Sequence, residues 1–340
     1  MREGLRRCRR GAFARRPIVQ ERNLSIAVLV PCYNEALTIA SVVSGFKSVL
    51  PDAAVYVYDN NSTDDTELCA LAAGAIVRRE PLQGKGHVMR RMFADIEADV
   101  YIMVDGDDTY DPAACLTMVD RLIENRLDLV NGRRVPVDNT AYRAGHRFGN
   151  RVLSAAVANV FGHRVEDMLS GLKVMSRRFV KSFPCLATGF EIETELTIHA
   201  LELRMPVAEC PVAYRDRHRD SHSKLNTIRD GLRVLSLIGA LVRAERPMVF
   251  FGAVFAALAI PALLMGASIY AEFLRTGLVA RFPTAILCSA MMLLAFLSVA
   301  CGLILETVSL GRREQKRMTY LSLRAVEAGR RSETYGAIAE

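Results

Sequence analysis

LSIAVLV, at residues 24–30, is the first of five short apolar runs that alternate with helical patterns. The others are VYVYD at 55–59, AIVRR at 75–79, VYIMVD at 100–105 and DLVNG at 128–132. Between them, the spacing of apolar residues predicts helices near 37–50, 64–73, 86–97 and 112–124. Strands that alternate with helices build a parallel sheet, so residues 24–132 predict an α/β fold with a mostly parallel sheet. Such sheets bind ligands at the carboxyl ends of their strands, where polar clusters follow several of these runs.

The composition excludes several classes of protein. Hydrophobic residues make up 51% and charged residues 24% of the 340 residues, which excludes an intrinsically disordered chain. The net charge is +7, and residues 1–22, with eight Arg and two Glu, contribute 8 − 2 = +6 of it. The remainder is nearly neutral, so no nucleic-acid partner is indicated. We expect the basic tail either to bind anionic lipid or to be a disordered extension.

The eight cysteines contain no CxxC pair, so the spacing indicates neither a zinc site nor a disulfide framework. Small buried cysteines fit a protein that faces a reducing cytosol.

Two uncharged apolar runs lie in the last third of the chain. Met248–Tyr270 has 270 − 248 + 1 = 23 residues and Thr284–Leu305 has 305 − 284 + 1 = 22. Each is long enough to cross a bilayer core of about 30 Å, with Pro261 bending rather than forbidding the first span. A pair of buried helices in a soluble core is the alternative.

The charges around these runs predict the orientation of the protein. Arg and Lys flank the outer ends at 243, 246, 312, 313, 316 and 317, whereas the connecting loop has only Arg275 and Arg281. The positive-inside rule therefore places both termini and the N-terminal domain in the cytosol. The chain reads as an integral protein of the cytoplasmic (inner) membrane without a signal peptide.

Apolar residues recur at helical spacing from Leu225 to Val242 beside several basic residues, which predicts an amphipathic helix on the membrane surface. The expected organisation is a basic tail at 1–23, a catalytic domain at 24–223, the interfacial helix at 224–246, a two-span hairpin at 247–310 and a cytosolic tail at 311–340.

The acidic run VYIMVDGDDTYDP at 100–112 predicts a cation site. Carboxylates at i and i+2 on an irregular turn, here Asp105 and Asp107, can both face one Mg²⁺ or Mn²⁺ that keeps further positions for phosphate oxygens. The alternative is an acidic loop that caps the next helix, which is the role expected for Asp111. Tyr110 and Leu116 stand where an EF-hand needs Gly and Glu, so a calcium loop of that type is excluded.

The glycine-rich run PLQGKGHV at 81–88 is neither a P-loop nor a dinucleotide fingerprint, because Arg79, Gly86 and Met89 break the required patterns. Two interpretations stay open: a close-approach loop that sets Lys85 beside an anionic ligand, or a turn that opens a helix.

Four motifs in order, VPCYNEA (30–36), VYDNNSTD (57–64), QGKG (83–86) and VDGDD (104–108), resemble the nucleotide-sugar-binding half of glycosyltransferase family 2, with its GT-A fold. Five later motifs are similar to the polyprenyl-phosphate branch of that family, which includes dolichol-phosphate mannose synthases and bactoprenol glucosyltransferases. They are NGRR (131–134), GHRFGNR (145–151), EDMLSGLKVMSR (166–177), GFEIETE (189–195) and RDRHRDSHSKLN (215–226). The likeness covers about residues 24–310.

The resemblance implies a donor site. The residues it assigns to the nucleotide sugar are Pro31, Tyr33, Glu35, Asp59, Asn60, Lys85, Asp105, Gly106 and Asp107. It implies that Asp105 and Asp107 hold Mg²⁺ or Mn²⁺ through the diphosphate, and that Thr109 stands where some relatives have a Gln ligand. Strand-end packing for Tyr33 and a helix cap for Glu35 are the structural alternatives.

The resemblance also implies catalytic cations. Arg134, Arg217 and Lys224 match residues that handle the donor diphosphate and the acceptor phosphate, alongside Asp107 as a catalytic residue. Arg217 and Lys224 have an alternative as lipid-headgroup contacts.

Three glutamates of GFEIETE (191, 193 and 195) are expected on a helix, where they orient the sugar or basic loops. The histidines at 87, 163, 199 and 218 have no ligand-like spacing and are interpreted as ordinary surface or core residues.

The activity implied by the family is inverting transfer of one sugar from a UDP- or GDP-sugar to polyprenyl (undecaprenyl or dolichyl) phosphate. A polysaccharide-elongating transferase is disfavoured because the chain contains no Trp and therefore no QxxRW motif. A catalytically silent membrane adaptor is the alternative from another class. The sequence leaves open which nucleotide sugar is the donor and whether the protein forms a homo-oligomer.

Overall fold

The computed structural model describes residues 24–136, 165–189, 191–215 and 246–325. The chain divides into two compact units. Of the described residues, 24–136, 165–189, 191–215 and 319–325 belong to the first unit, and 246–318 belong to the second.

The first unit is built on a twisted sheet of seven strands within the described residues, in the order β3-β2-β1-β4-β6-β5-β7. The strands are β1 (Ile26–Cys32), β2 (Ala54–Asp59), β3 (Ile76–Arg79), β4 (Val100–Met103), β5 (Leu129–Pro136), β6 (Lys173–Ser176) and β7 (Val207–Tyr214). Strand β6 runs antiparallel to β4 and β5, and the other pairs are parallel. The predicted mostly parallel sheet is confirmed, and β6 and β7 are strands that the sequence pattern did not predict.

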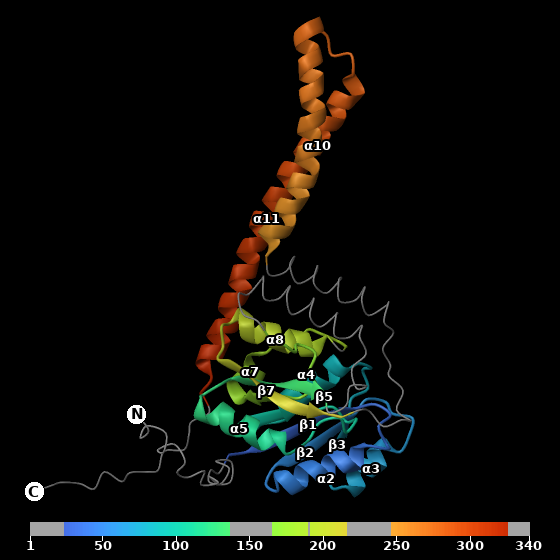
Figure 1. Ribbon diagram of the computed structural model, residues 1–340, viewed down its shortest axis with the longest axis vertical. Helices are drawn as coiled ribbons and strands as arrows, with labels where there is room; N and C mark the ends of the chain where they lie inside the picture. The colour runs from blue at the N-terminus through green and yellow to red at the C-terminus, as the bar shows by residue number, and fades with distance from the viewer. Residues whose placement is uncertain (1–23, 137–164, 190, 216–245, 326–340) are drawn as a thin grey trace, which may run out of the picture. The chain divides into compact units, whose positions relative to one another are not determined.

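Helices cover both faces of this sheet (Figure 1). One core packs β-strand side chains such as Val28 against α2 (Ile39–Val49), α3 (Thr66–Ala72) and α5 (Ala114–Glu124). The other packs alternate side chains such as Leu29 against α4 (Lys85–Asp95), α7 (Arg177–Ser182) and α8 (Ile192–Glu202). Because both faces are buried, β1 and β4 are apolar at nearly every position, which is the reason their runs were recognisable in the sequence.

The second unit contains α10 (Pro247–Thr276) and α11 (Phe282–Ser322) as far as residue 318. The two helices have 30 and 41 residues and are long and apolar enough to cross a membrane, by length and composition. Helix α10 continues through Pro261, as expected for a tolerated proline. The predicted interfacial helix at 224–246 and the basic tail at 1–23 lie outside the described residues, apart from Arg246.

Candidate active site

Carboxylates gather at the carboxyl ends of β1, β2 and β4. The parallel register sets Cys32 opposite Asp59, and the chain after β4 stays beside β1 through a hydrogen bond from Val104 N to Leu29 O (3.1 Å). Burial, followed by the charges of four nearby carboxylates, raises the pKa of the Cys32 thiol well above its usual value. Those carboxylates belong to Glu35, Asp59, Asp105 and Asp107. Four of the predicted site residues therefore surround one strand end.

The loops after β1 and β2 are tied together. Asn34 adopts a left-handed conformation (φ 53°), its backbone N–H donates to Ser62 Oγ (2.9 Å), and its side-chain oxygen accepts from Thr63 N (2.8 Å). This pairing fixes Asp59, whose Oδ2 accepts from Ser62 N (3.1 Å). Within the described residues the buried Asp59 Oδ1 has no hydrogen-bond donor, so it is available to an N–H or O–H of a ligand.

The side chain of Asn60 forms hydrogen bonds within the protein. Its amide nitrogen donates to Glu80 O (2.9 Å) and Leu82 O (2.8 Å), and its oxygen accepts from Gly84 N (2.7 Å). Asn60 thus holds the loop that precedes α4, and its predicted contact with a nucleotide stays a prediction.

The Asp-Gly-Asp turn after β4 is locked from two sides. Thr38 Oγ1 donates to Gly106 O (2.6 Å), and a Cβ at Gly106 would lie 2.8 Å from Cys32 Sγ, so only glycine fits this turn. The fully buried Thr109 donates its hydroxyl to Asp107 Oδ1 (2.7 Å). Thr109 therefore orients Asp107. This hydrogen bond accounts for the position of the Thr109 side chain, and the predicted role of Thr109 as a metal ligand stays a prediction.

Two neighbouring aspartates, Asp108 and Asp111, form hydrogen bonds to α2 and to the turn that leads into α5. Ser41 of α2 donates to Asp108 Oδ2 (2.8 Å), and Asp111 Oδ1 accepts from Ala113 N (3.1 Å) at the start of α5. Asp111 therefore stabilises the turn that precedes α5, but the N-cap residue of this helix is Ala113, which has no side-chain capping hydrogen bond.

Lys85 lies beside Asp105. Its Nζ is 2.5 Å from Asp105 Oδ1 and 2.5 Å from Glu193 Oε1, and its side chain is 8% exposed. Burial by itself lowers the pKa of Lys85, but the two carboxylates outweigh it and hold the pKa above its ordinary value. Lys85 is therefore a charged ammonium within the site.

The QGKG loop opens helix α4, as one of its two interpretations expected, and its contact with an anionic ligand stays a prediction. Lys85 opens helix α4, and a Cβ at Gly84 or Gly86 would lie 2.2 Å from Thr188 O or 2.1 Å from Ala187 O. The close approach that the glycines permit is therefore to the protein's own chain. Glu195 supports the same segment, since its carboxylate accepts from the backbone N–H groups of residues 186 and 187.

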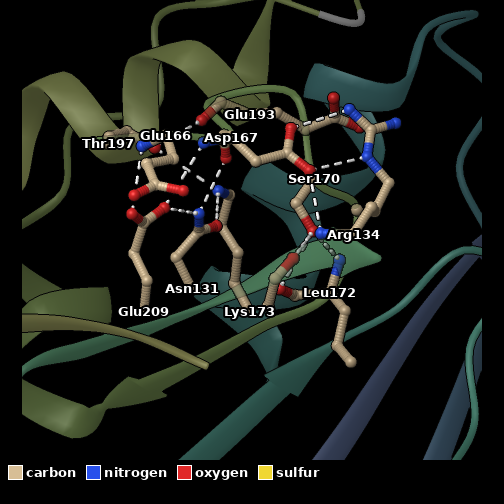
Figure 2. Close-up of polar contacts among 12 residues, drawn as sticks. Asn131, Arg134, Glu166, Asp167, Ser170, Leu172, Lys173, Glu193, Thr197 and Glu209 are labelled. Carbon is tan, nitrogen blue, oxygen red and sulfur yellow. Dashed lines mark hydrogen bonds and ion pairs between the residues drawn. The ribbon is translucent and has the colours of Figure 1, made fainter. Parts of the chain in front are cut away.

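Arg134 of β5 is held by a buried carboxylate (Figure 2). Its Nε donates to Asp167 Oδ2 (2.8 Å) and a terminal nitrogen donates to Asp167 Oδ1 (2.8 Å). The Arg134 backbone N–H also donates to Asp167 Oδ2 (3.1 Å). Although burial raises it, the net effect of these contacts is to lower the pKa of Asp167. The guanidinium also packs over the ring of Tyr214, 5.5 Å from its centroid. This fork fixes both the position and the orientation of Arg134.

A second layer of polar groups fixes Asp167 (Figure 2). Asn131 donates to Asp167 O (2.7 Å) and to Glu209 Oε1 (3.0 Å), and it accepts from the fully buried Lys173 (2.6 Å). Glu209 also accepts from the backbone N–H groups of residues 166 and 167. Burial lowers the pKa of Lys173 to about 8, against the opposing charges of Glu193, Asp167 and Glu209.

Tyr110 contacts both the segment before β6 and the ring of Tyr214 on β7. Its hydroxyl accepts from Gly171 N (2.8 Å), and its ring packs edge-on against Tyr214 (5.3 Å between centroids). Burial raises the pKa of Tyr110 well above its ordinary value, Arg134 lowers it and Asp105 raises it. Arg134, from β5, and Asp105, from the turn after β4, thus both act electrostatically on one buried side chain.

The residues present fit a hard divalent cation. Asp105 and Asp107 supply carboxylate oxygens from one turn, and the ammonium of Lys85 at Asp105 shows that this position favours positive charge. Across the described residues no three His, Cys, Asp or Glu side chains are placed so that they could hold one metal ion by themselves. A cation at this turn would therefore need further oxygens, which water and donor phosphates supply to Mg²⁺ in proteins.

The remaining predicted residues divide into two groups. Pro31, Tyr33 and Glu35 lie half-buried at the end of β1 and in the loop after it, and Thr38 Oγ1 lies 3.4 Å from Glu35 Oε2. Arg217 and Lys224 lie outside the described residues, as do His163 and His218. His199 is a core residue between Phe179 and Phe183, as expected.

The site also includes residues that the sequence did not single out: Tyr110, Asp167, Gly171, Lys173 and Glu209. Most belong to β6, β7 or the segment before β6. Lys173, the one charged residue in the otherwise apolar run 172–175, was the available signal.

The fold and the Asp-Gly-Asp turn define a glycosyltransferase of the GT-A type. The model of "Glycosyl transferase family 2" matches residues 27–183. Protein RfbJ of Shigella flexneri is 53% identical over 126 residues, 37% of this chain and 98% of that protein. Glycosyltransferase AglJ of Haloferax volcanii is 32% identical over 231 residues, 68% of this chain and 76% of its own length. The chain belongs to glycosyltransferase family 2.

Two further comparisons bear on ligands. A dolichyl-phosphate hexose transferase of Haloferax volcanii is 27% identical over 222 residues, 65% of this chain and 95% of that protein. Among solved structures, glucosyl-3-phosphoglycerate synthase of Mycobacterium tuberculosis in complex with Mn²⁺, UDP and glucosyl-3-phosphoglycerate matches with a TM-score of 0.53 and 27% identity. The match covers 65% of this chain and 79% of that chain.

Proposed function

We propose that the protein moves one sugar from a UDP- or GDP-linked donor to polyprenyl phosphate at the cytosolic face of a membrane, with inversion at the anomeric carbon and with Mg²⁺ or Mn²⁺ bound. The observation that carries this proposal is the Asp105–Asp107 turn with the Lys85 ammonium 2.5 Å from Asp105, together with the Arg134 guanidinium that Asp167 holds on β5. That arrangement suits a reaction in which two phosphorus groups approach each other.

The acceptor needs little activation. A phosphate monoester has a second pKa of about 6 and is largely dianionic at neutral pH, so no strong general base is required. One phosphate oxygen forms a bond to the anomeric carbon while the bond from that carbon to the nucleoside diphosphate breaks. The obstacle is repulsion between two anions, which cationic groups reduce.

The residues divide this task between two sides. Asp105 and Asp107 would hold the divalent ion, which stabilises the charge of the departing diphosphate. Lys85 supplies a further positive charge on the donor side. Asp167 fixes the orientation of Arg134. Arg134, Arg217 and Lys224 are proposed to bind the acceptor phosphate. Asp59, with an unused buried oxygen, is proposed to read the base or ribose.

The membrane part of the proposal is supported by two helices of sufficient length and apolar character. It is supported further by the name of the dolichyl-phosphate hexose transferase, which is similar to this chain over 222 residues. We propose that 24–223 is the catalytic domain, that 247–310 forms a membrane hairpin and that both termini are cytosolic.

The test uses the full chain in detergent with undecaprenyl phosphate, Mg²⁺ or Mn²⁺ and a panel of labelled UDP- and GDP-sugars. Label in the organic phase, released by mild acid, supports transfer to the lipid. The same panel with 3-phosphoglycerate tests a soluble phosphate acceptor, which the similarity to glucosyl-3-phosphoglycerate synthase makes worth excluding. Label on the soluble acceptor alone would contradict the proposed acceptor.

A further inference from the structure

Lys85 bridges two carboxylates that have different surroundings. Asp105 is 26% exposed and belongs to the turn proposed to bind the cation, whereas Glu193 is 10% exposed and belongs to helix α8. Both oxygens lie 2.5 Å from the ammonium. One positive charge therefore faces two negative charges in a largely buried place.

The far side of Asp105 is closed by the main chain. A Cβ built on Gly171 would lie 2.0 Å from Asp105 Oδ2, so the start of β6 blocks that oxygen from swinging away. Asp105 cannot retreat from Lys85 in that direction, and an arriving cation has to compete with the ammonium for the same carboxylate.

The charges favour an exchange only when a diphosphate arrives. A divalent cation alone would have to share the Asp105 carboxylate with an ammonium that lies 2.5 Å from it and repels the cation. A nucleoside diphosphate brings negative charge that can accept both the cation and the ammonium. Glu193 keeps Lys85 in place during this change, because its carboxylate stays paired with the ammonium.

We infer that Lys85 is an exchangeable counter-ion. It pairs with Asp105 in the metal-free enzyme and yields this carboxylate to the divalent cation when the donor diphosphate offers the ammonium a new partner. Glu193 is the positioning residue that retains Lys85. This inference rests on the proposed function and deepens it. It makes metal and donor binding mutually dependent, since each raises the affinity of the other by the same factor.

The test measures Mn²⁺ binding to the full chain in detergent by the electron paramagnetic resonance signal of free Mn²⁺, with and without UDP. For the wild type we expect UDP to tighten Mn²⁺ binding about tenfold or more. Lys85→Met should bind Mn²⁺ alone about tenfold tighter than the wild type and should lose most of the effect of UDP. Lys85→Arg keeps the charge and should retain the coupling.

Glu193→Gln is an independent test, because its result does not depend on whether Lys85→Met folds. With its second partner neutral, the ammonium pairs with Asp105 alone, so Mn²⁺ binding without UDP should weaken several-fold relative to the wild type. Lys47→Met, on the exposed face of α2, is the control and should match the wild type.

The outcomes separate the inference from the function. If the wild type binds Mn²⁺ with UDP but Lys85→Met shows neither a gain with Mn²⁺ alone nor a loss of coupling, the exchange is overturned and the metal-dependent function stands. Unchanged Mn²⁺ affinity in Glu193→Gln would likewise overturn it. If UDP binds to the wild type but Mn²⁺ does not, the metal-dependent function itself falls, and the exchange with it.

Discussion

Gly171→Ala tests whether the position of Asp105 matters for the reaction. The added Cβ would lie 2.0 Å from Asp105 Oδ2 and 2.6 Å from its Cγ, whereas ordinary contacts begin at 3.4 Å. The carboxylate or the start of β6 must therefore shift by 3.4 − 2.0 = 1.4 Å. Overpacking of this kind costs about 1–3 kcal/mol of stability, which a folded domain of this size can tolerate.

The effect on activity should be larger than the effect on stability. A displacement of about 1 Å at a reacting centre can reduce a rate about 100-fold, so we expect kcat/KM to fall by roughly that factor. The assay is transfer of labelled sugar to undecaprenyl phosphate, with Mn²⁺ binding measured on the same preparation. Gly252→Ala is the control, because no atom lies within 4 Å of its added Cβ. A Gly171→Ala enzyme with kcat/KM and Mn²⁺ affinity within threefold of the wild type would refute the assignment of Asp105.

Three other substitutions test separate parts of the account. Asp107→Asn should abolish transfer while membrane insertion stays unchanged; near-normal turnover would remove the metal assignment. Arg134→Lys loses the fork to Asp167, an interaction of about 1.5–3 kcal/mol, so the melting temperature should fall by several degrees and kcat/KM by about 10- to 100-fold; an unaffected rate would exclude Arg134 from the site. Lys173→Met tests the lowered pKa of the buried lysine. The pKa of Lys173 is about 10.5 in the unfolded chain and about 8 in the folded chain, so between these pH values the unfolded state binds more protons. The free energy of unfolding of the wild type therefore rises with pH in this window. Relative to Lys173→Met, the wild type should therefore gain up to about 3 kcal/mol of unfolding free energy between pH 7 and 10.5, and parallel profiles would contradict the lowered pKa.

The sequence predicted the part of the fold that depends on local pattern. Strands β1 to β5 and helices α2 to α5 agree with the apolar runs and helical spacings to within a few residues, because strands buried on both faces leave a continuous apolar signature. The Asp105–Asp107 turn was equally visible, since it follows a buried strand directly.

Long-range pairing could not be predicted in the same way. Lys173 lies opposite Met103 and Asn131 because β6 runs antiparallel between β4 and β5, so the start of β6, rather than its end, reaches the site. No periodicity in residues 172–176 announces that direction. Gly171, Asp167 and Glu209 were missed for this reason, although each is explained once the strand order is known.

Lys85 shows how a residue singled out by a motif can have unexpected partners. One of the two interpretations placed it beside an anionic ligand, and in the structure it contacts Asp105 and Glu193, which are 20 and 108 residues away in the chain. The preference for Glu193 as a residue that orients a basic loop agrees with this contact.

The most direct test of the central claim is transfer of sugar to undecaprenyl phosphate in the presence of excess chelator. If the reaction needs a cation at the Asp105–Asp107 turn, transfer stops when the divalent ion is removed and returns when Mg²⁺ or Mn²⁺ is restored, with the melting temperature unchanged throughout. Full transfer by a preparation that contains no divalent ion would contradict it.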